Sequence, residues 1–233
     1  MKFQFSIQQY QTDAVKSTVD VFKGQTFRNT ITFTQSHDDL GNVYFGQKNA
    51  ELTLDSRDLL ENIRRIQQAN DIKQLSKLAP SHGLGAYVLD IEMETGTGKT
   101  YVYIKTMFEL NKNYGWKKFI VVVPTVAIRE GVAKSFSMLE DHFMEQYGQK
   151  ARYFVYNSKQ LNDISAFAYS DALSVMIINM QAFSSSLRPD GTQKDAKIIN
   201  SEPDFPKCLA PKTVKHFGRQ RNPKKRERIA LLF

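Results

Sequence analysis

The sequence has few of the residues that build disulfide frameworks or zinc sites. Its 233 residues include one cysteine, Cys208, so no disulfide can form within the chain. The four histidines are scattered and show no zinc-ligand spacing (His37, His82, His142 and His216). These absences exclude a disulfide-stapled scaffold and a zinc-binding module, and we interpret these side chains as packed or solvated.

Long apolar runs are also lacking. No stretch approaches the roughly 20 consecutive apolar residues that a membrane-spanning helix needs, and the opening Met1-Lys-Phe-Gln-Phe-Ser lacks the apolar region of a signal peptide. With 41% hydrophobic and 24% charged residues, the composition is typical of a globular protein with one good core. We therefore expect no membrane association and a cytoplasmic location.

Positive charge is in excess, but only in one segment. The formal net charge is +8. Residues 207–233 contain nine basic side chains and one acidic side chain, whereas residues 1–206 contain 23 of each. The globular part is therefore neutral, and we expect residues 206–233 to form a basic, disordered tail. As an alternative, such a tail binds phosphates non-specifically through counterion release.

The second part of the chain alternates between two kinds of hydrophobic pattern. Strands are expected at 86–93, 118–123, 153–156 and 173–178, and helices at 99–111, 126–147 and 158–167. Apolar residues recur every three or four positions in the longest helix, as on a helix that covers a sheet (Ile128, Val132, Phe136, Leu139 and Phe143). Strict alternation of strand and helix predicts an α/β fold, with a parallel sheet and helices on both faces.

The first part of the chain has a different pattern. Residues 3–22 place apolar side chains at helical spacing, and Gly24 ends this amphipathic helix. Two short alternating segments follow, and then a helix that begins at Ser56 and runs towards Asn70. We interpret residues 25–80 as a small α+β segment inserted into the main domain.

The strongest chemical signal lies between the first expected strand of the sheet and the helix that follows it. The chain there contains a glycine-rich loop made of Thr95, Gly96, Thr97, Gly98, Lys99 and Thr100. Glycines allow a tight turn whose N–H groups point at phosphate oxygens, and the positive end of the following helix adds to that field. The lysine reaches the β- and γ-phosphates, and the threonine hydroxyl ligates the bridging Mg²⁺.

This loop predicts ATP and Mg²⁺ as cofactors. Lys99 and Thr100 are the expected catalytic residues, and Thr100 is the expected metal ligand. The strict phosphate-loop pattern has glycine where this chain has Met93. The alternative interpretation is an incidental glycine turn with no ligand.

Further blocks agree with the loop in order and spacing. They cover residues 92–103, 114–132, 152–161 and 175–183. Together these blocks resemble the motor of superfamily-two helicases and, within it, the restriction (Res) subunit of type III restriction-modification systems. The resemblance covers residues 1 to about 205. It implies a RecA-like P-loop domain, and members of this family tolerate a residue other than glycine at the position of Met93.

The resemblance also assigns roles to residues outside the loop. Gln11 stands where the family has a glutamine that reads adenine, although by residue chemistry alone it is a solvated helix residue. Pro124 and Thr125 match a loop that contacts the DNA backbone, and Asn179 and Gln181 match a further strand-contacting motif. The implied partners are double-stranded DNA and the modification methyltransferase (Mod) subunit, which supplies sequence recognition.

Several parts of the family's machinery are not found in the sequence. No apolar strand followed by Asp-Glu, the acidic pair needed for ATP hydrolysis, occurs after Lys99, and Glu202 is a weak substitute. Pro189-Asp190 with Asp195 and Lys197 mimics a nuclease site, but the intervening loop is too short to provide two strand ends, so we interpret it as a coincidence. A second motor domain and a nuclease domain are missing too.

We therefore expect the N-terminal ATP-binding motor domain of a type III Res subunit, over residues 1–205, as a truncated product that is not catalytic alone. In the complete enzyme this domain would drive ATP-dependent DNA translocation and cleavage. Two alternatives stay open: another DEAD-like helicase or ATPase, and a non-catalytic nucleotide-binding interaction module.

Overall fold

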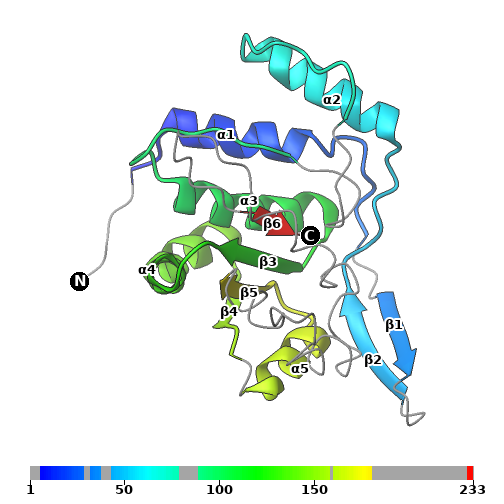
Figure 1. The fold of residues 1–233 in the computed structure, drawn as a ribbon, viewed down its shortest axis with the longest axis vertical. Coiled ribbons are helices and arrows are strands. Elements are labelled where there is room, and N and C mark those ends of the chain that lie inside the picture. Colours follow the sequence, from blue (N-terminus) through cyan, green and yellow to red (C-terminus); the bar gives the residue numbers. More distant parts are fainter. Residues whose placement is uncertain are drawn as a thin grey trace, which may run out of the picture.

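The computed structural model describes residues 6–28, 32–37, 43–78, 89–157, 160–179 and 230–232. The helices and strands follow one another along the chain as α1 (Gln9–Asp20), β1 (Thr32–His37), β2 (Val43–Lys48), α2 (Ser56–Ala69), α3 (Lys99–Tyr114), β3 (Lys118–Val123), α4 (Val126–Tyr147), β4 (Arg152–Val155), α5 (Leu161–Tyr169), β5 (Ser174–Asn179) and β6 (Ala230–Leu232) (Figure 1).

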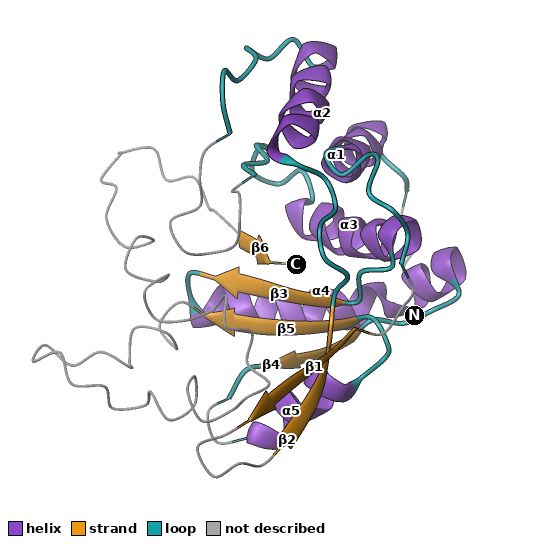
Figure 2. Cartoon of the chain, turned by 90° about the vertical axis from the view of Figure 1, so that its right-hand side faces the viewer, coloured by secondary structure: helices purple, strands orange, loops and turns teal. Residues whose placement is uncertain are grey.

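The main sheet has four strands in the order β4-β5-β3-β6. Strands β3 and β4 both pair in parallel with β5, and the three arrows point the same way in Figure 2. Only β6 is antiparallel, on the free side of β3. The parallel strands are joined through helices, which confirms the predicted α/β fold.

Alternate residues of the strands face two different sets of helices. Phe119 and Val121 of β3, with Ile177 of β5, belong to the large core that includes α3 and α4. Ile120 of β3 and Met176 of β5 belong to a smaller core with α5. Because successive side chains of a strand point to opposite faces, helices cover both faces of the sheet, as expected.

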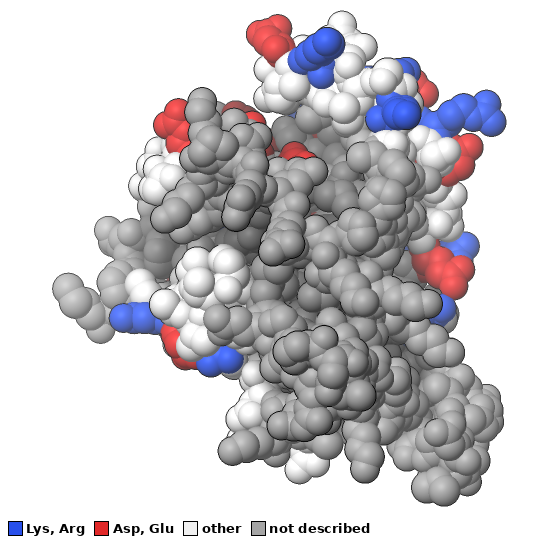
Figure 3. Space-filling model, viewed as in Figure 1, with Lys and Arg blue, Asp and Glu red and all other residues white. Residues whose placement is uncertain are grey.

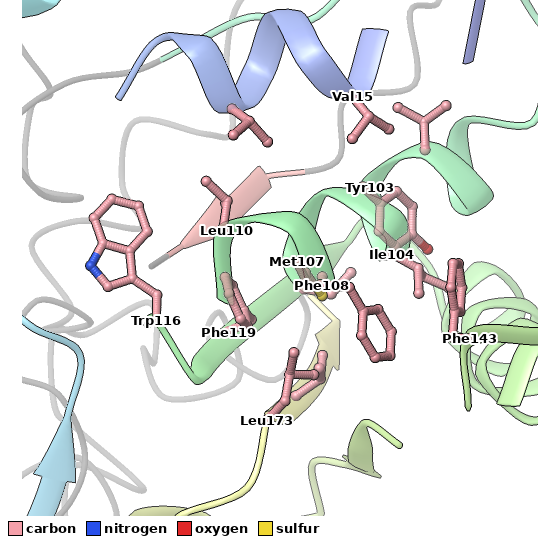
Figure 4. Close-up of a cluster of buried hydrophobic side chains, with 14 of the residues drawn as sticks. Val15, Tyr103, Ile104, Met107, Phe108, Leu110, Trp116, Phe119, Phe143 and Leu173 are labelled. Atoms are coloured by element: carbon pink, nitrogen blue, oxygen red, sulfur yellow. The ribbon is translucent and has the colours of Figure 1, made fainter. Parts of the chain in front are cut away.

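Two further helices lie beyond α3. In Figure 1 the order from the top is α2, α1, α3, the sheet and α5. Val15 of α1 and Leu59 of α2 are buried in the same core as α3. Figure 4 shows Val15 above the side chains of α3, including Tyr103 and Leu110. The helix α3 is therefore covered on nearly all sides, which fixes the segment that follows the glycine-rich loop.

The segment interpreted as an insertion, residues 25–80, contains the hairpin and helix that the sequence indicates. Strands β1 and β2 form a separate antiparallel pair, and α2 begins with a capping box between Asp55 and Asp58. The side chain of Asn49 joins this segment to the main sheet. Its Oδ1 accepts from the backbone N–H groups of Lys117 and Lys118 at 2.8 and 2.9 Å, and its Nδ2 donates to the Lys118 carbonyl at 2.8 Å.

The structure differs from the expected elements in two places. In the strand expected at 86–93, residues 86–88 lie outside the described residues, and residues 89–93 carry no strand. The side of β3 that a further parallel strand could join is occupied by β6, and residues 89–93 do not pair with β3. Residues 230–232 lie within the expected disordered tail and form that strand.

The helix expected at 3–22 begins later, at Gln9, because residues 6–8 are not helical, and the other predicted elements agree to within a few residues. The strand at 118–123 and the helix at 126–147 match β3 and α4 at both ends. Four of the five residues in the predicted apolar stripe are buried, and Ile128 is partly buried. Among the described residues, no helix is long and apolar enough to cross a bilayer.

Candidate nucleotide-binding site

The glycine-rich loop turns directly into the first residue of α3. Gly96 and Gly98 both have a φ of +83°, a left-handed conformation that glycine adopts without strain. Gly98 is the N-cap of α3, and its carbonyl accepts the first helical bond, from the N–H of Val102 at 3.1 Å. The first N–H groups of the helix therefore have no acceptor within it and are directed at the loop.

Gln11 of α1 closes one side of this loop. Its Nε2 donates to the backbone carbonyl of Thr97 at 2.9 Å. A Cβ atom placed on Gly98 would lie 2.4 Å from the same nitrogen, a distance that real structures do not tolerate. Glycine is therefore favoured here by its positive φ, and a side chain at this position would also displace the Gln11 amide from the loop.

The position of Gln11 follows from the packing of α1 on α3. Val15 and Val19 of α1 are buried in the core shared with α3. At the far end of both helices, the hydroxyl of Tyr114 donates to the carbonyl of Val19 at 3.1 Å. The two helices thus run in the same direction, with Gln11 beside the start of α3.

Lys99 contacts its own loop. Its Nζ donates to the backbone carbonyl of Glu94 at 2.8 Å, and the Thr97 hydroxyl donates to the same oxygen at 2.7 Å. Thr95 and Gly96 are exposed, and residues 97–100 are half-buried. The lysine ammonium, the first helical N–H groups and the Thr100 hydroxyl therefore lie together beside a loop that solvent can reach.

Chain connectivity places this loop at the carboxyl edge of the sheet. Three residues join the end of α3 to the start of β3, so the helix and the strand run in opposite directions. A helix of 16 residues is about 24 Å long and a strand of six residues about 20 Å. The start of α3 therefore lies near the end of β3, the edge at which α/β proteins bind ligands.

The residues expected to contact DNA follow the same strand ends. Val123 pairs in register with Asn179, so Pro124 and Thr125 leave the sheet at the edge where β5 ends. Thr125 is exposed, and its hydroxyl accepts from the N–H of Ile128 at 3.3 Å as the N-cap of α4. Its O–H can still be donated to a phosphate. Asn179 is buried, and Gln181 lies outside the described residues.

An aromatic array supports the loop from the side of α4. Tyr101, next to Thr100, stacks on Phe143 of α4, and its hydroxyl lies 3.1 Å from the Nε2 of His142. Phe143 stacks on Phe108 of α3. Burial lowers the pKa of His142, and the nearby Lys105 lowers it further. This aromatic array was not predicted from the sequence. The spacing of aromatic residues along α3 and α4 is the local pattern that could have indicated it.

Among the described residues, no three His, Cys, Asp or Glu side chains are grouped so that they could hold a metal ion. Glu202, the weak candidate for the hydrolytic acid, and the nuclease-like residues Asp190, Asp195 and Lys197 lie outside the described residues. The Thr100 hydroxyl, the predicted metal ligand, lies in the first turn of α3 beside the loop.

Comparisons with known proteins agree with the family expected from the sequence. Residues 4–205 match the family model described as "Type III restriction enzyme, res subunit". The chain is 39% identical over 114 residues to the type III restriction-modification enzyme EcoP15I Res subunit of Escherichia coli, and 37% identical over 114 residues to the EcoPI Res subunit of Escherichia phage P1. Each alignment covers 48% of this chain and 11% of the relative.

A further relative is the StyLTI Res subunit of Salmonella typhimurium, which is 51% identical over 61 residues, 26% of this chain and 6% of that protein. The aligned parts are therefore a small fraction of each full-length relative.

Proposed function

Because this chain belongs to the family of type III restriction enzyme Res subunits, we propose that its glycine-rich loop binds ATP with Mg²⁺ as the nucleotide site of a DNA-translocating motor. The observation that carries the proposal is the contact between Gln11 and the loop. A base-reading side chain and a phosphate loop, 86 residues apart, meet at the open end of α3.

Each residue of the loop has a part in this proposal. The N–H groups from Thr95 to Thr100 hold the phosphates, and Lys99 exchanges the Glu94 carbonyl for phosphate oxygens. Thr100 ligates Mg²⁺, which neutralises phosphate charge when bound. Gln11 reads adenine from the neighbouring helix. These residues fit the group because the loop offers unpaired N–H donors, one cation and one hydroxyl.

The DNA part of the proposal rests on the strand ends. Pro124 and Thr125 would contact the sugar-phosphate backbone, and Asn179 and Gln181 would contribute further contacts. On the parts of the face in Figure 3 that are not grey, basic and acidic side chains lie near one another towards the margins. The proposed contacts use oriented hydrogen-bond donors, as at Thr125. The complete motor would act on double-stranded DNA with the Mod subunit.

Calorimetry on the purified chain tests the nucleotide site. We expect ATP with Mg²⁺ to bind, and Lys99→Ala to weaken binding at least tenfold, because the lysine is the only charged donor of the loop. The matched control is Lys112→Ala, which removes an exposed lysine near the other end of α3. Equal ATP affinity in the wild type and in Lys99→Ala would refute the assignment.

A further inference from the structure

Tyr103 is a buried tyrosine whose hydroxyl has no hydrogen-bond partner among the described residues. The side chain is 7% exposed and belongs to the core cluster drawn in Figure 4. The other buried tyrosine hydroxyl of this helix, that of Tyr114, donates to the Val19 carbonyl. Buried polar groups are nearly always paired, so the unpaired hydroxyl of Tyr103 needs an explanation.

The explanation lies one turn earlier on the same helix. Side chains in a helix point back towards its N-terminus, so the ring of Tyr103 leans over the turn that contains Lys99 and Thr100. Burial raises the pKa of the Tyr103 hydroxyl well above its usual range, and the Thr100 side chain opposes this by a smaller effect. The Thr100 side chain is thus a close polar neighbour of the Tyr103 hydroxyl.

Thr100 itself differs from other helical threonines in the chain. The hydroxyls of Thr12, Thr18 and Thr106 each donate to the carbonyl four residues earlier. Thr100 makes no such bond within the described part of the chain, so its proton is not committed to the backbone. A hydroxyl that turns a lone pair to a cation must direct its proton away from that cation, towards another acceptor.

We propose that Tyr103 is a positioning residue for the metal ligand: its phenol oxygen accepts the Thr100 proton and thereby holds the Thr100 oxygen towards Mg²⁺. This inference rests on the proposed Mg²⁺–ATP site and adds to it a residue outside the loop. It also gives the buried Tyr103 hydroxyl a partner, because its oxygen accepts the proton of Thr100. Outer-shell partners of this kind orient metal ligands in many proteins.

The test compares ATP affinity with Mg²⁺ and with EDTA, by calorimetry, in the wild type and in Tyr103→Phe. The substitution removes one oxygen and keeps the ring. We expect the affinity in EDTA to be unchanged and the gain in affinity from Mg²⁺ to fall roughly threefold to tenfold, the effect of one hydrogen bond. Thermal stability should not fall, because the lost hydroxyl had no partner.

Two further variants separate positioning from general packing. In a Thr100→Val background, Tyr103→Phe should cause no additional loss, because the pair is already broken. Tyr147→Phe is the matched control. The Tyr147 hydroxyl donates to Glu109 at 2.7 Å, so its removal should lower thermal stability. Mg²⁺ should still raise the ATP affinity of this variant as much as it does for the wild type.

The proposal would be overturned if Mg²⁺ raised the ATP affinity of Tyr103→Phe as much as that of the wild type. It would also be overturned if the variant lost ATP affinity equally with and without Mg²⁺. Neither result would contradict the nucleotide site itself. A wild-type chain that binds ATP no better than Lys99→Ala would overturn the proposed function and this inference with it.

Discussion

The side-chain amide of Gln11 and the backbone carbonyl of Thr97 lie 2.9 Å apart, so a helix near the start of the chain is bonded to the turn of the phosphate loop. This bond engages one amide hydrogen of Gln11. The carbonyl oxygen and the second hydrogen are available for a base, and the same residue can therefore sense both the base and the loop.

Gln11→Ala should lower the affinity for ATP and remove most of the preference for ATP over GTP. We expect a loss of roughly threefold to tenfold for ATP, because one or two hydrogen bonds to adenine are removed, and little change for GTP. Gln9→Ala is the control, since the Gln9 amide bonds only Asp13 on the exposed side of α1. An unchanged ratio of ATP to GTP affinity, measured by calorimetry, would contradict the role of Gln11.

Alanine at two glycines should have opposite effects on stability. Gly98→Ala forces a Cβ into a left-handed residue and against the Gln11 amide, so the free energy of unfolding should fall by about 1 kcal/mol or more. Gly131→Ala lies within α4 with nothing within 4 Å of the new Cβ, and should raise it by about 0.5–1 kcal/mol. Urea unfolding measures both, and a stabilised Gly98→Ala chain would contradict the left-handed conformation of Gly98.

Lys118 should make stability depend on pH above neutrality. The side chain is buried at the end of α5, and its ammonium donates to the carbonyls of Phe167 and Ser170. Burial lowers the pKa of Lys118 from 10.5 to about 8, against a smaller opposing effect of Asp171. Between these two pH values the unfolded chain holds more protons than the folded chain, so this group makes the free energy of unfolding rise with pH.

The size of that rise has an upper limit of about 3 kcal/mol, and the two carbonyls reduce it by favouring the charged form. Urea unfolding of the wild type and of Lys118→Met at pH 7.5 and 9.5 measures the difference. The wild type should gain more stability over this range than the variant. An equal change in the free energy of unfolding of the two chains between these pH values would mean that the pKa of Lys118 is not lowered.

Salt-sensitive binding to DNA should come mainly from residues 207–233, because residues 1–206 are neutral by count. Each phosphate contact contributes about −0.9 to the slope of log affinity against log salt concentration. Removal of residues 207–233 should therefore flatten the slope in titrations with duplex DNA. If the deletion leaves the slope unchanged, the phosphate contacts are made by the strand-end loop at Thr125 instead.

Local patterns were enough to predict most of the elements. The stripe that includes Val132 and Phe136 predicts α4 because every third or fourth residue of a helix shares one face. The glycine-rich loop was found for a similar reason, since its chemistry is contained in six consecutive residues. Gln11 required the family resemblance, because a glutamine early in a helix carries no chemical signal by itself.

Contacts between distant segments were decided by the tertiary structure. A lysine at the start of a strand is expected to be exposed, but Lys118 is buried beneath the end of α5. The expected strand at 86–93 is not formed over residues 89–93, where β6 instead takes the free side of β3. Periodicity specifies which face of an element is apolar, but it does not specify the partner, since many elements offer a compatible face or edge. The sequence alone therefore determined most of the elements and the loop, and packing decided that Gln11 contacts the loop.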